Sequence, residues 1–342
     1  MLHERPRYVA SSRREFLIAA LAGVPLALIS GCAVSRESRS QVGRNQPAVT
    51  NYGEGGNFVI REGKTLLLVL SFPVMTGKLI GDLPVRTEPE SARSQLAEPQ
   101  PLFFYPSEHN LISRAILSAP LDVVQGVYTA SIAGLQEQAK RRWDIKYFIR
   151  SGNYQETVLN VDKSFTEPSA DETAAMRRDF ETIRAIVQRR TQRRWNAPFI
   201  HPVSGPDRDN FGDKRTYNDT KHSRHAGLDY QASMGTPVMA INDGIVAFSG
   251  EQLVPGNTVC IDHGGGIFSR YMHLSRLDVH EGDEVGRGVV IGLSGDSGGQ
   301  KPQPHLHVAV IVNGVQVDPK DFMHTAMELL ALEAQDRKKD NG

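Results

Sequence analysis

Five side chains in the last third or so of the sequence have the types and spacing of a metal-dependent site. His225 and Asp229 are four residues apart in HSRHAGLDY, which puts both on one face of a strand or a helix. His305 and His307 are two apart in PHLHVAV, so a strand would present both imidazoles on one side. His273 lies between these motifs, in RYMHL. Two neutral imidazoles, one carboxylate and an open fourth position are the requirement of catalytic zinc.

Such a site implies hydrolysis by water that the metal activates. Water on zinc has a pKa near ~7, so a hydroxide nucleophile exists at neutral pH. Three of the five side chains would hold the metal, and the surplus histidines would accept the proton of the water, stabilise the oxyanion or protonate a leaving amine. HxxxD and HxH are weak motifs alone, but together in one compact region they predict a metal site. The other histidines of this region are predicted to be surface or core residues: His201, His222, His263, His280 and His324.

The segments that must position these residues have a β pattern with frequent glycine. GLDY and HLHVAV favour strands, and Tyr271 is predicted to share a strand face with His273. The turn and strand of residues 235–246 recur in residues 282–291, which indicates a duplicated hairpin. An antiparallel all-β domain is therefore predicted, with its edges turned by glycine.

A helix is predicted before this domain. There the spacing of apolar residues changes from every second residue to every third or fourth residue. Four apolar residues recur along one predicted face: Met176, Phe180, Ile183 and Val187. Ser169 and Glu172 have the spacing of a capping box. Four arginines follow, and they are predicted to complement the helix dipole as a solvated face rather than to bind an anionic polymer: Arg189, Arg190, Arg193 and Arg194.

The fold class is predicted to be mainly all-β, in several segments. Short β-type runs separated by Pro, Gly, Ser and Asn turns indicate an immunoglobulin-like β-sandwich without an active site. The predicted segments are a signal peptide over residues 1–31, a flexible tether over 32–56, the sandwich over 57–165, a linker helix over 166–196, the antiparallel β domain with the candidate metal site over 197–322, and a C-terminal helix with a fraying tail over 323–342.

The N-terminus has the three-part form of an export signal. Arg13 and Arg14 precede an uncharged run from Phe16 to Ser30, which is short for a membrane span of about 20 residues. SRREFL resembles a twin-arginine signal, and ISGC resembles a lipobox in which Cys32 becomes a lipid anchor. A plain cleaved signal is the alternative. Ala33 after the cysteine favours the outer membrane, on the periplasmic side of the envelope.

Composition and charge exclude several classes of partner. The chain has 342 residues with 39 basic and 39 acidic side chains, so no global field attracts nucleic acid. Only two cysteines occur, which excludes a disulfide framework, and Cys260 is predicted to be a buried hydrophobe.

The quoted motifs, with GDEVGRGVVIGLSGDSG and NGVQVDP, resemble the lysostaphin-type (LytM-like) zinc endopeptidases of bacterial cell walls over about residues 197–320. The resemblance implies one Zn²⁺ per domain, held by His225, Asp229 and His307, and catalytic roles for His305 and His273. Asn218 lies where some members carry an asparagine that blocks the metal, which suggests autoinhibition.

This sequence departs from the family pattern at two places beside the HxH motif. Val308-Ala309 replace a common Phe-Glu, and Gln303 replaces a glycine. Neither departure touches a ligand, so we expect them to alter the shape of the groove rather than the chemistry.

The predicted function is cleavage of stem or cross-link peptides in peptidoglycan, by a lipid-anchored protein of the envelope. The alternative is a non-catalytic protein that binds peptidoglycan or activates another wall hydrolase, although relatives of that kind usually lack ligands. A biotinyl- or lipoyl-type carrier is excluded because the domain has no suitable lysine at a hairpin tip. Which bond is cut depends on loop shape and does not follow from spacing.

Overall fold

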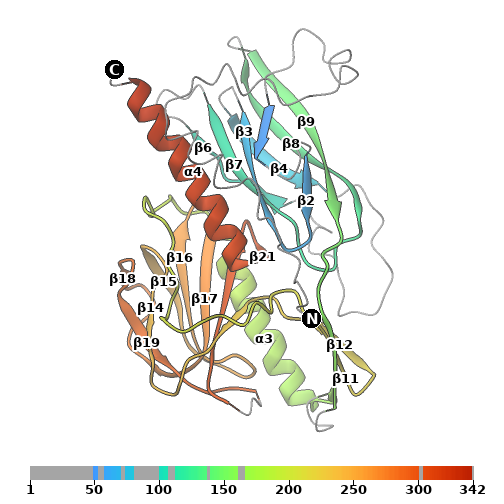
Figure 1. The fold of residues 1–342 in the computed structure, drawn as a ribbon, viewed down its shortest axis with the longest axis vertical. Helices are drawn as coiled ribbons and strands as arrows, with labels where there is room; N and C mark the ends of the chain where they lie inside the picture. Colours follow the sequence, from blue (N-terminus) through green and yellow to red (C-terminus); the bar gives the residue numbers. More distant parts are fainter. Residues whose placement is uncertain are drawn as a thin grey trace, which may run out of the picture. The chain divides into compact units, whose positions relative to one another are not determined.

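The computed structural model describes residues 49–52, 58–70, 74–80, 100–106, 112–136, 139–160, 166–299 and 303–340. These residues are mainly β, with two long helices (Figure 1). The predicted signal peptide and the predicted anchor Cys32 lie outside the described residues. None of the described helices has an apolar stretch of the length and hydropathy that crossing a membrane requires.

Two sheets form the first β-rich region. One has the order β1 (Val49–Tyr52), β3 (Thr65–Leu70), β7 (Ser113–Ser118) and β6 (Tyr105–Pro106). The other has the order β2 (Val59–Arg61), β9 (Ala139–Arg150), β8 (Gly126–Gln136), β4 (Val74–Ile80) and β5 (Gln100–Pro101). Alternate residues of both sheets share one apolar core, which includes Leu68, Leu117 and Ile132. The immunoglobulin-like topology stays a prediction.

The predicted tether is wrong at its C-terminal end. β1 lies within it and pairs antiparallel with β3, with Val49 opposite Leu70. Pairing with an apolar neighbouring strand orders a segment whose own sequence has no apolar period.

Nine strands form the sheet of the second β-rich region. Its main path is β13 (Leu228–Tyr230), β20 (Leu306–Val312), β17 (Ile267–Leu277), β16 (Gly256–Gly264), β15 (Gly244–Gln252) and β18 (Glu284–Val285). The other members are β14 (Pro237–Met239), β19 (Val290–Ser294) and β21 (Val315–Val317). All its pairs are antiparallel, as the sequence predicts.

A small third sheet joins the two regions. β10 (Glu156–Leu159) pairs in parallel with β11 (Lys214–Tyr217), and β11 pairs with β12 (Lys221–Arg224). One apolar core also spans the regions, because Leu67 and Ile116 of the first pack in the same cluster as Leu228 and Val310 of the second.

The helix α3 (Ala170–Val187) has the predicted capping box, and its predicted apolar face is buried only in part. Glu172 N donates to Ser169 Oγ at 3.2 Å, while Ser169 N donates to the Glu172 carboxylate. Ile183 and Ile186 are buried against Cys260 and Phe268, whereas the side of the helix with Phe180 is open and that residue is 65% exposed. Phe180 therefore belongs to the predicted apolar face but not to the core.

For two of the four arginines, Arg190 and Arg193, the prediction of a solvated dipole-complementing face is wrong. The helix ends at Val187, so all four follow it. The Arg193 guanidinium lies 3.8 Å from the centre of the Trp195 ring and pairs with Glu333 at 2.6 Å. Arg190 stacks over Phe103 at 4.9 Å. Cation–π contacts and an ion pair give these two arginines structural roles.

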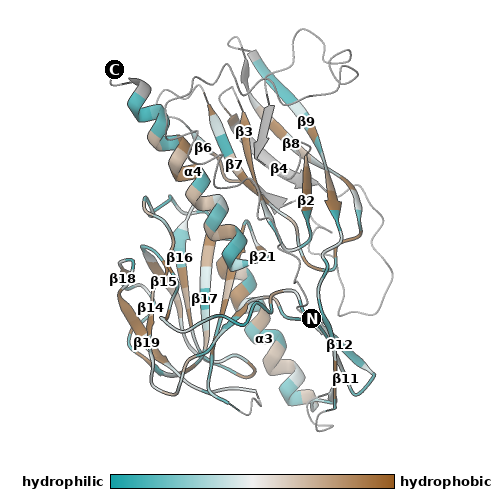
Figure 2. Cartoon of the chain, viewed as in Figure 1, coloured by the Kyte–Doolittle hydropathy of each residue, from teal (hydrophilic) through white to brown (hydrophobic). Residues whose placement is uncertain are grey.

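The C-terminal helix α4 (Pro319–Asp340) is longer and more buried than predicted. Phe322, Ala326 and Leu329 have no exposed surface, and the helix contacts both β3 and β20. Hydrophilic and hydrophobic residues alternate along it (Figure 2). Fraying from Asp336 is not seen, since its carboxylate pairs with the buried Arg114 of β7.

Buried groups of the second region match the structural roles that the sequence assigned to them. Cys260 is fully buried, and burial raises the pKa of its thiol to about 12. His263 is also fully buried, donates from Nδ1 to Asp243 O at 2.8 Å and contacts Ser269 Oγ through Nε2. Burial lowers the pKa of His263 to about 4, so the ring is neutral near pH 7.

Candidate metal centre

Two of the predicted ligands are direct partners in the sheet. Asp229 of β13 lies opposite His307 of β20 in the antiparallel register. His225 lies on neither strand: β12 ends at Arg224 and β13 begins at Leu228, so His225 and Asp229 do not share one strand face. The bend between them brings the two side chains together in place of strand alternation.

Three donor atoms converge at this point. Asp229 Oδ1 lies 2.7 Å from His307 Nδ1 and 3.1 Å from His225 Nε2. His225 Nε2 and His307 Nδ1 are 3.0 Å apart. Ligand atoms of a tetrahedral zinc site are about 3.3 Å apart for bonds of about 2.0 Å. The three atoms therefore have the spacing of one face of such a tetrahedron.

The donors are arranged for a cation. His225 Nδ1 contacts Asn210 O at 2.8 Å and must donate to it, so Nε2 of the neutral ring carries only a lone pair. That lone pair faces Asp229 Oδ1, which is also an acceptor. Burial acts to raise the pKa of Asp229, but the imidazoles of His225 and His307 in their protonated forms outweigh it and hold the pKa well below its usual range. A divalent cation would turn this meeting of acceptors into coordination, so the residues fit the metal.

Gly227 provides the space that the ring of His307 occupies. A Cβ on Gly227 would lie 2.3 Å from His307 Nε2 and 2.7 Å from His307 Cε1. Any side chain here would displace a ligand, so this position requires glycine because of close approach and not because of its backbone angle.

The two predicted catalytic histidines flank the three donors. His305 Nε2 lies 4.0 Å from Asp229 Oδ1, and the rings of His305 and His273 are 4.8 Å apart. Each ring contacts a main-chain carbonyl through Nδ1: His273 contacts Ser297 O at 2.9 Å, and His305 contacts Gln303 O at 3.1 Å. A ring that donates through Nδ1 keeps Nε2 as its acceptor in the neutral form.

His273 reaches the site through an irregularity in β17. Its φ is +62°, and the register with β16 shifts between the pairs Asn257–Leu274 and Val259–Tyr271. A β-bulge of this kind redirects a side chain. Tyr271 packs in the apolar core and accepts a hydrogen bond from Ile241 N, whereas His273 contacts His305, so the predicted common face of Tyr271 and His273 is wrong.

Asn210 contacts two ligands, and the sequence did not single it out. Its Nδ2 donates to Asp229 Oδ2 at 3.0 Å, its Oδ1 accepts from Asp229 N, and its carbonyl accepts from His225. Outer partners of this type orient metal ligands and fix their tautomers. Asn218 instead lies in the turn between β11 and β12, where its N donates to Leu159 O and its Nδ2 to Thr166 Oγ1. Autoinhibition by Asn218 stays a prediction.

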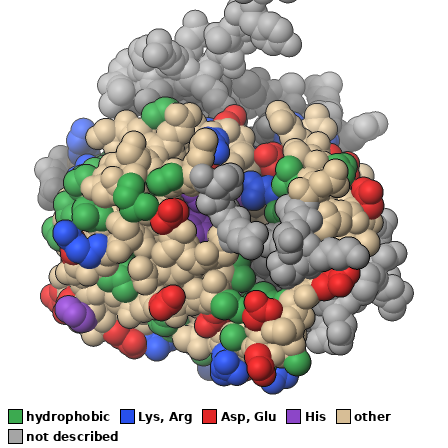
Figure 3. All heavy atoms as spheres, turned by 90° about the horizontal axis from the view of Figure 1, so that it is seen from below, with side chains coloured by type: hydrophobic (Ala, Val, Ile, Leu, Met, Phe, Trp, Pro, Cys, Tyr) green, Lys and Arg blue, Asp and Glu red, His purple; other side chains and the backbone are tan. Residues whose placement is uncertain are grey.

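The site is largely enclosed by protein. His225, Asp229, His273 and His305 are at most 7% exposed, while the side chain of His307 is 12% exposed. In the view of Figure 3, histidine atoms are visible at depth near the middle of the face. The surrounding protein thus restricts the water around the donors, which strengthens electrostatic interactions there.

Comparison with known proteins agrees with this geometry. Residues 223–319, which include all five site residues, match Peptidase family M23. The chain contains an M23 peptidase domain. It is 41% identical over 110 residues to the peptidoglycan DD-endopeptidase ShyA of Vibrio cholerae, covering 32% of this chain and 25% of that protein. It is 40% identical over 121 residues to the DD-carboxypeptidase/endopeptidase Mpg of Neisseria meningitidis, covering 34% of this chain and 28% of that protein.

Similarity of fold extends beyond the M23 domain. A solved structure from Pseudomonas aeruginosa that is described as a peptidase M23 has a TM-score of 0.56 and 22% identity, covering 77% of this chain and 94% of that one. The shared fold therefore extends beyond residues 223–319. The matches to ShyA and Mpg span less than a third of those proteins, so the activity of the whole chain does not follow from theirs.

The departures from the family pattern lie inside the M23 domain. Val308 and Ala309 are fully buried in β20, where Val308 pairs with Leu228 and Tyr271. They fill the interior of the sheet, so the expectation that they reshape the groove is wrong. Gln303 contributes its carbonyl to His305.

Proposed function

We propose that the M23 domain is a zinc-dependent endopeptidase that hydrolyses peptide bonds in peptidoglycan stem or cross-link peptides. The observation that carries the proposal is the convergence of His225 Nε2, Asp229 Oδ1 and His307 Nδ1 within 3.1 Å of one another. Two imidazoles and one carboxylate with neighbouring titratable histidines form the donor set of a hydrolytic zinc centre. The peptidoglycan substrate is supported by the names of the relatives.

Three residues would bind the ion: His225, Asp229 and His307. His305 and His273 would accept and donate protons during hydrolysis. Zinc at this position supplies Lewis acidity, which polarises a carbonyl group and lowers the pKa of water. One of the flanking imidazoles accepts the proton of the attacking water on Nε2. The other, in its protonated form, donates to the developing oxyanion or to the leaving amine. Their carbonyl partners, Ser297 and Gln303, keep both rings oriented during these transfers.

Digestion of isolated sacculi tests the activity. We expect the full chain to release soluble peptide-containing fragments, to lose this activity after treatment with a chelator and to regain it with Zn²⁺. Mass analysis of the fragments identifies the bond, and metal analysis of the protein identifies the ion. Binding to sacculi without release of fragments would instead indicate the non-catalytic binding protein.

We also propose an exported, lipid-anchored location at the envelope. The support is the sequence of residues 1–32, with paired arginines, an uncharged run and Cys32 in ISGC. In cells given labelled palmitate, the wild-type protein is expected to take up the label. The Cys32→Ala variant is expected to take up none and to be found in the soluble fraction. A wild-type protein without label would indicate the plain cleaved signal.

A further inference from the structure

The 62–65 loop, which joins β2 to β3 and ends at the first residue of β3, contacts the M23 domain at Arg224 and at Asp318. Its residues belong to the N-terminal β-rich region, far from the ligands in sequence. Two separate sets of polar contacts leave this loop, one through Arg224 and one through the start of α4. Both lead to the segment of residues 207–213 that carries Asn210.

The first set begins at Glu62. Its carboxylate forms an ion pair with Arg224, the residue directly before the ligand His225. The two side chains are only 5% and 9% exposed, and Arg224 Nε also pairs with Asp122 Oδ1 at 2.8 Å. Removing one partner of a buried ion pair leaves an uncompensated charge, so this pair constrains the position of Arg224.

Arg224 is connected by hydrogen bonds to the main chain around His225. Its Nη1 donates to Gly212 O at 3.0 Å, and Gly212 N donates to His225 O at 2.7 Å. His225 N in turn donates to Asp213 O. The main chain of the ligand is thus hydrogen-bonded on both sides to the segment that Arg224 holds.

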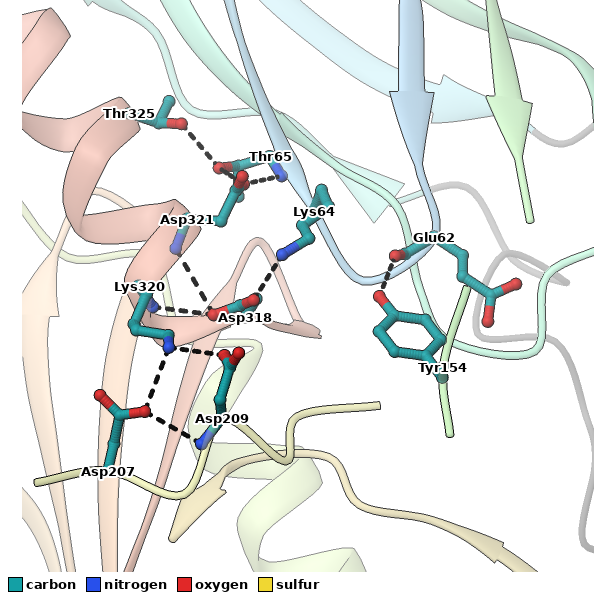
Figure 4. A network of polar contacts seen from close by, with 10 residues as sticks. All are labelled: Glu62, Lys64, Thr65, Tyr154, Asp207, Asp209, Asp318, Lys320, Asp321 and Thr325. Carbon is teal, nitrogen blue, oxygen red and sulfur yellow. Dashed lines mark hydrogen bonds and ion pairs between the residues drawn. The ribbon is translucent and has the colours of Figure 1, made fainter. Parts of the chain in front are cut away.

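The second set begins at Lys64 and Thr65 and is drawn in Figure 4. Lys64 Nζ pairs with Asp318 Oδ2 at 2.5 Å, and Thr65 N and Oγ1 donate to Asp321 Oδ2 at 2.7 and 2.8 Å. Asp318 Oδ1 accepts from Lys320 N at 2.9 Å at the beginning of α4. The loop therefore fixes the first turn of this helix.

Lys320 extends from that turn to the segment that carries Asn210. Its Nζ donates to Asp209 Oδ1 at 2.6 Å and to Asp207 Oδ1 at 3.1 Å. Between them, Arg208 N donates to Asp229 O at 2.9 Å. Asn210 follows directly and bonds both His225 and Asp229.

We propose that the 62–65 loop is a positioning element of the metal centre, which holds His225 and Asp229 in place through Arg224 and through the first turn of α4. The N-terminal region then contributes to metal affinity without touching the metal. The proposal rests on the proposed function, since it concerns the same centre. Partners outside the ligands change metal affinity about 10–100-fold when they are removed.

Zinc affinity of the full chain, measured by competition with a chromogenic chelator, tests the role of the loop. We expect Glu62→Gln and Lys64→Met each to weaken zinc binding by about tenfold, the lower end of that range. Asn210→Ala sets the scale, because it removes a side chain that contacts Asp229 directly. Thermal unfolding of each metal-free variant reports whether it folds. Lys64, with a side chain 31% exposed, carries the test if Glu62→Gln does not fold.

Asp336→Asn is the matched control. It breaks another ion pair between α4 and the N-terminal region, with the buried Arg114, near the other end of the helix. We expect it to lower the unfolding temperature without changing zinc affinity. Wild-type affinity in Glu62→Gln and Lys64→Met would overturn the proposal, and so would an equal loss in all three variants. Wild-type protein that binds zinc but does not digest sacculi would overturn the proposed function alone, and wild-type protein without zinc would overturn both.

Discussion

Replacing His307 by alanine is expected to abolish both zinc binding and the release of fragments from sacculi. The variant loses one of three donor atoms, and the remaining contact between His225 Nε2 and Asp229 Oδ1 at 3.1 Å can then be bridged by a proton on the imidazole. We expect zinc affinity to fall by more than the roughly 100-fold that loss of an outer partner costs. Metal content after dialysis and the rate of fragment release measure the two effects.

The control for this prediction is His280→Ala. His280 is also a histidine of the M23 domain, but its side chain is 92% exposed and its nearest ionic partner is Asp283. It should keep wild-type zinc content and activity. A His307→Ala protein that digests sacculi at the wild-type rate would exclude the metal centre as the site of hydrolysis.

The types and spacing of the site residues could be predicted because they are set by the chemistry. HxxxD and HxH place donors a few residues apart, and their antiparallel strands bring Asp229 opposite His307. The route by which each residue reaches the site could not be predicted. The positive φ of His273 and the bulge beside it break the alternation on which strand reasoning depends.

The sequence pattern does not indicate the roles of residues that act through main-chain contacts. Asn210 lies in the loop DRDNFG, where polar residues are expected for turn formation alone. Arg224 is one charged residue beside a histidine, and only the fold reveals that Glu62 is its partner. The asparagine, aspartate and glycine of the loop could at most have marked it as an ordered turn close to the first motif.

The wrong predictions concern faces that tertiary contacts decide. A helical period identified α3, but it could not distinguish the buried Ile183 and Ile186 from the exposed Phe180, because that depends on which face meets β15 and β16. The sequence assigns the arginines after the helix to its dipole, whereas contacts with Trp195 and with Tyr105, which is distant in sequence, determine the position of Arg193. Local patterns therefore predict elements well and partners poorly.

The histidines of the site fall into two pairs, one placed to bind the metal and one placed to transfer protons. His225 and His307 point ring nitrogens at Asp229 Oδ1 within 3.1 Å, whereas His305 Nε2 stays 4.0 Å away beside His273. A ligand and a proton-transfer group should therefore respond differently to removal. Removing a ligand should lower both the metal content and the rate of fragment release, whereas removing a proton-transfer group should lower only the rate.

His305→Ala is accordingly expected to slow fragment release by about 10²–10⁴-fold while zinc remains bound with nearly wild-type affinity. The ring that is lost exchanges a proton during hydrolysis, so the pH profile of the residual activity should also lose the limb that this group provides. His222→Ala, at an exposed position of β12, serves as the control and should behave as wild type. Loss of zinc as complete as in His307→Ala would make His305 a ligand, and unchanged hydrolysis would remove it from the mechanism. Only retention of zinc with loss of rate fits the geometry, in which His305 faces the donors from outside their mutual contacts.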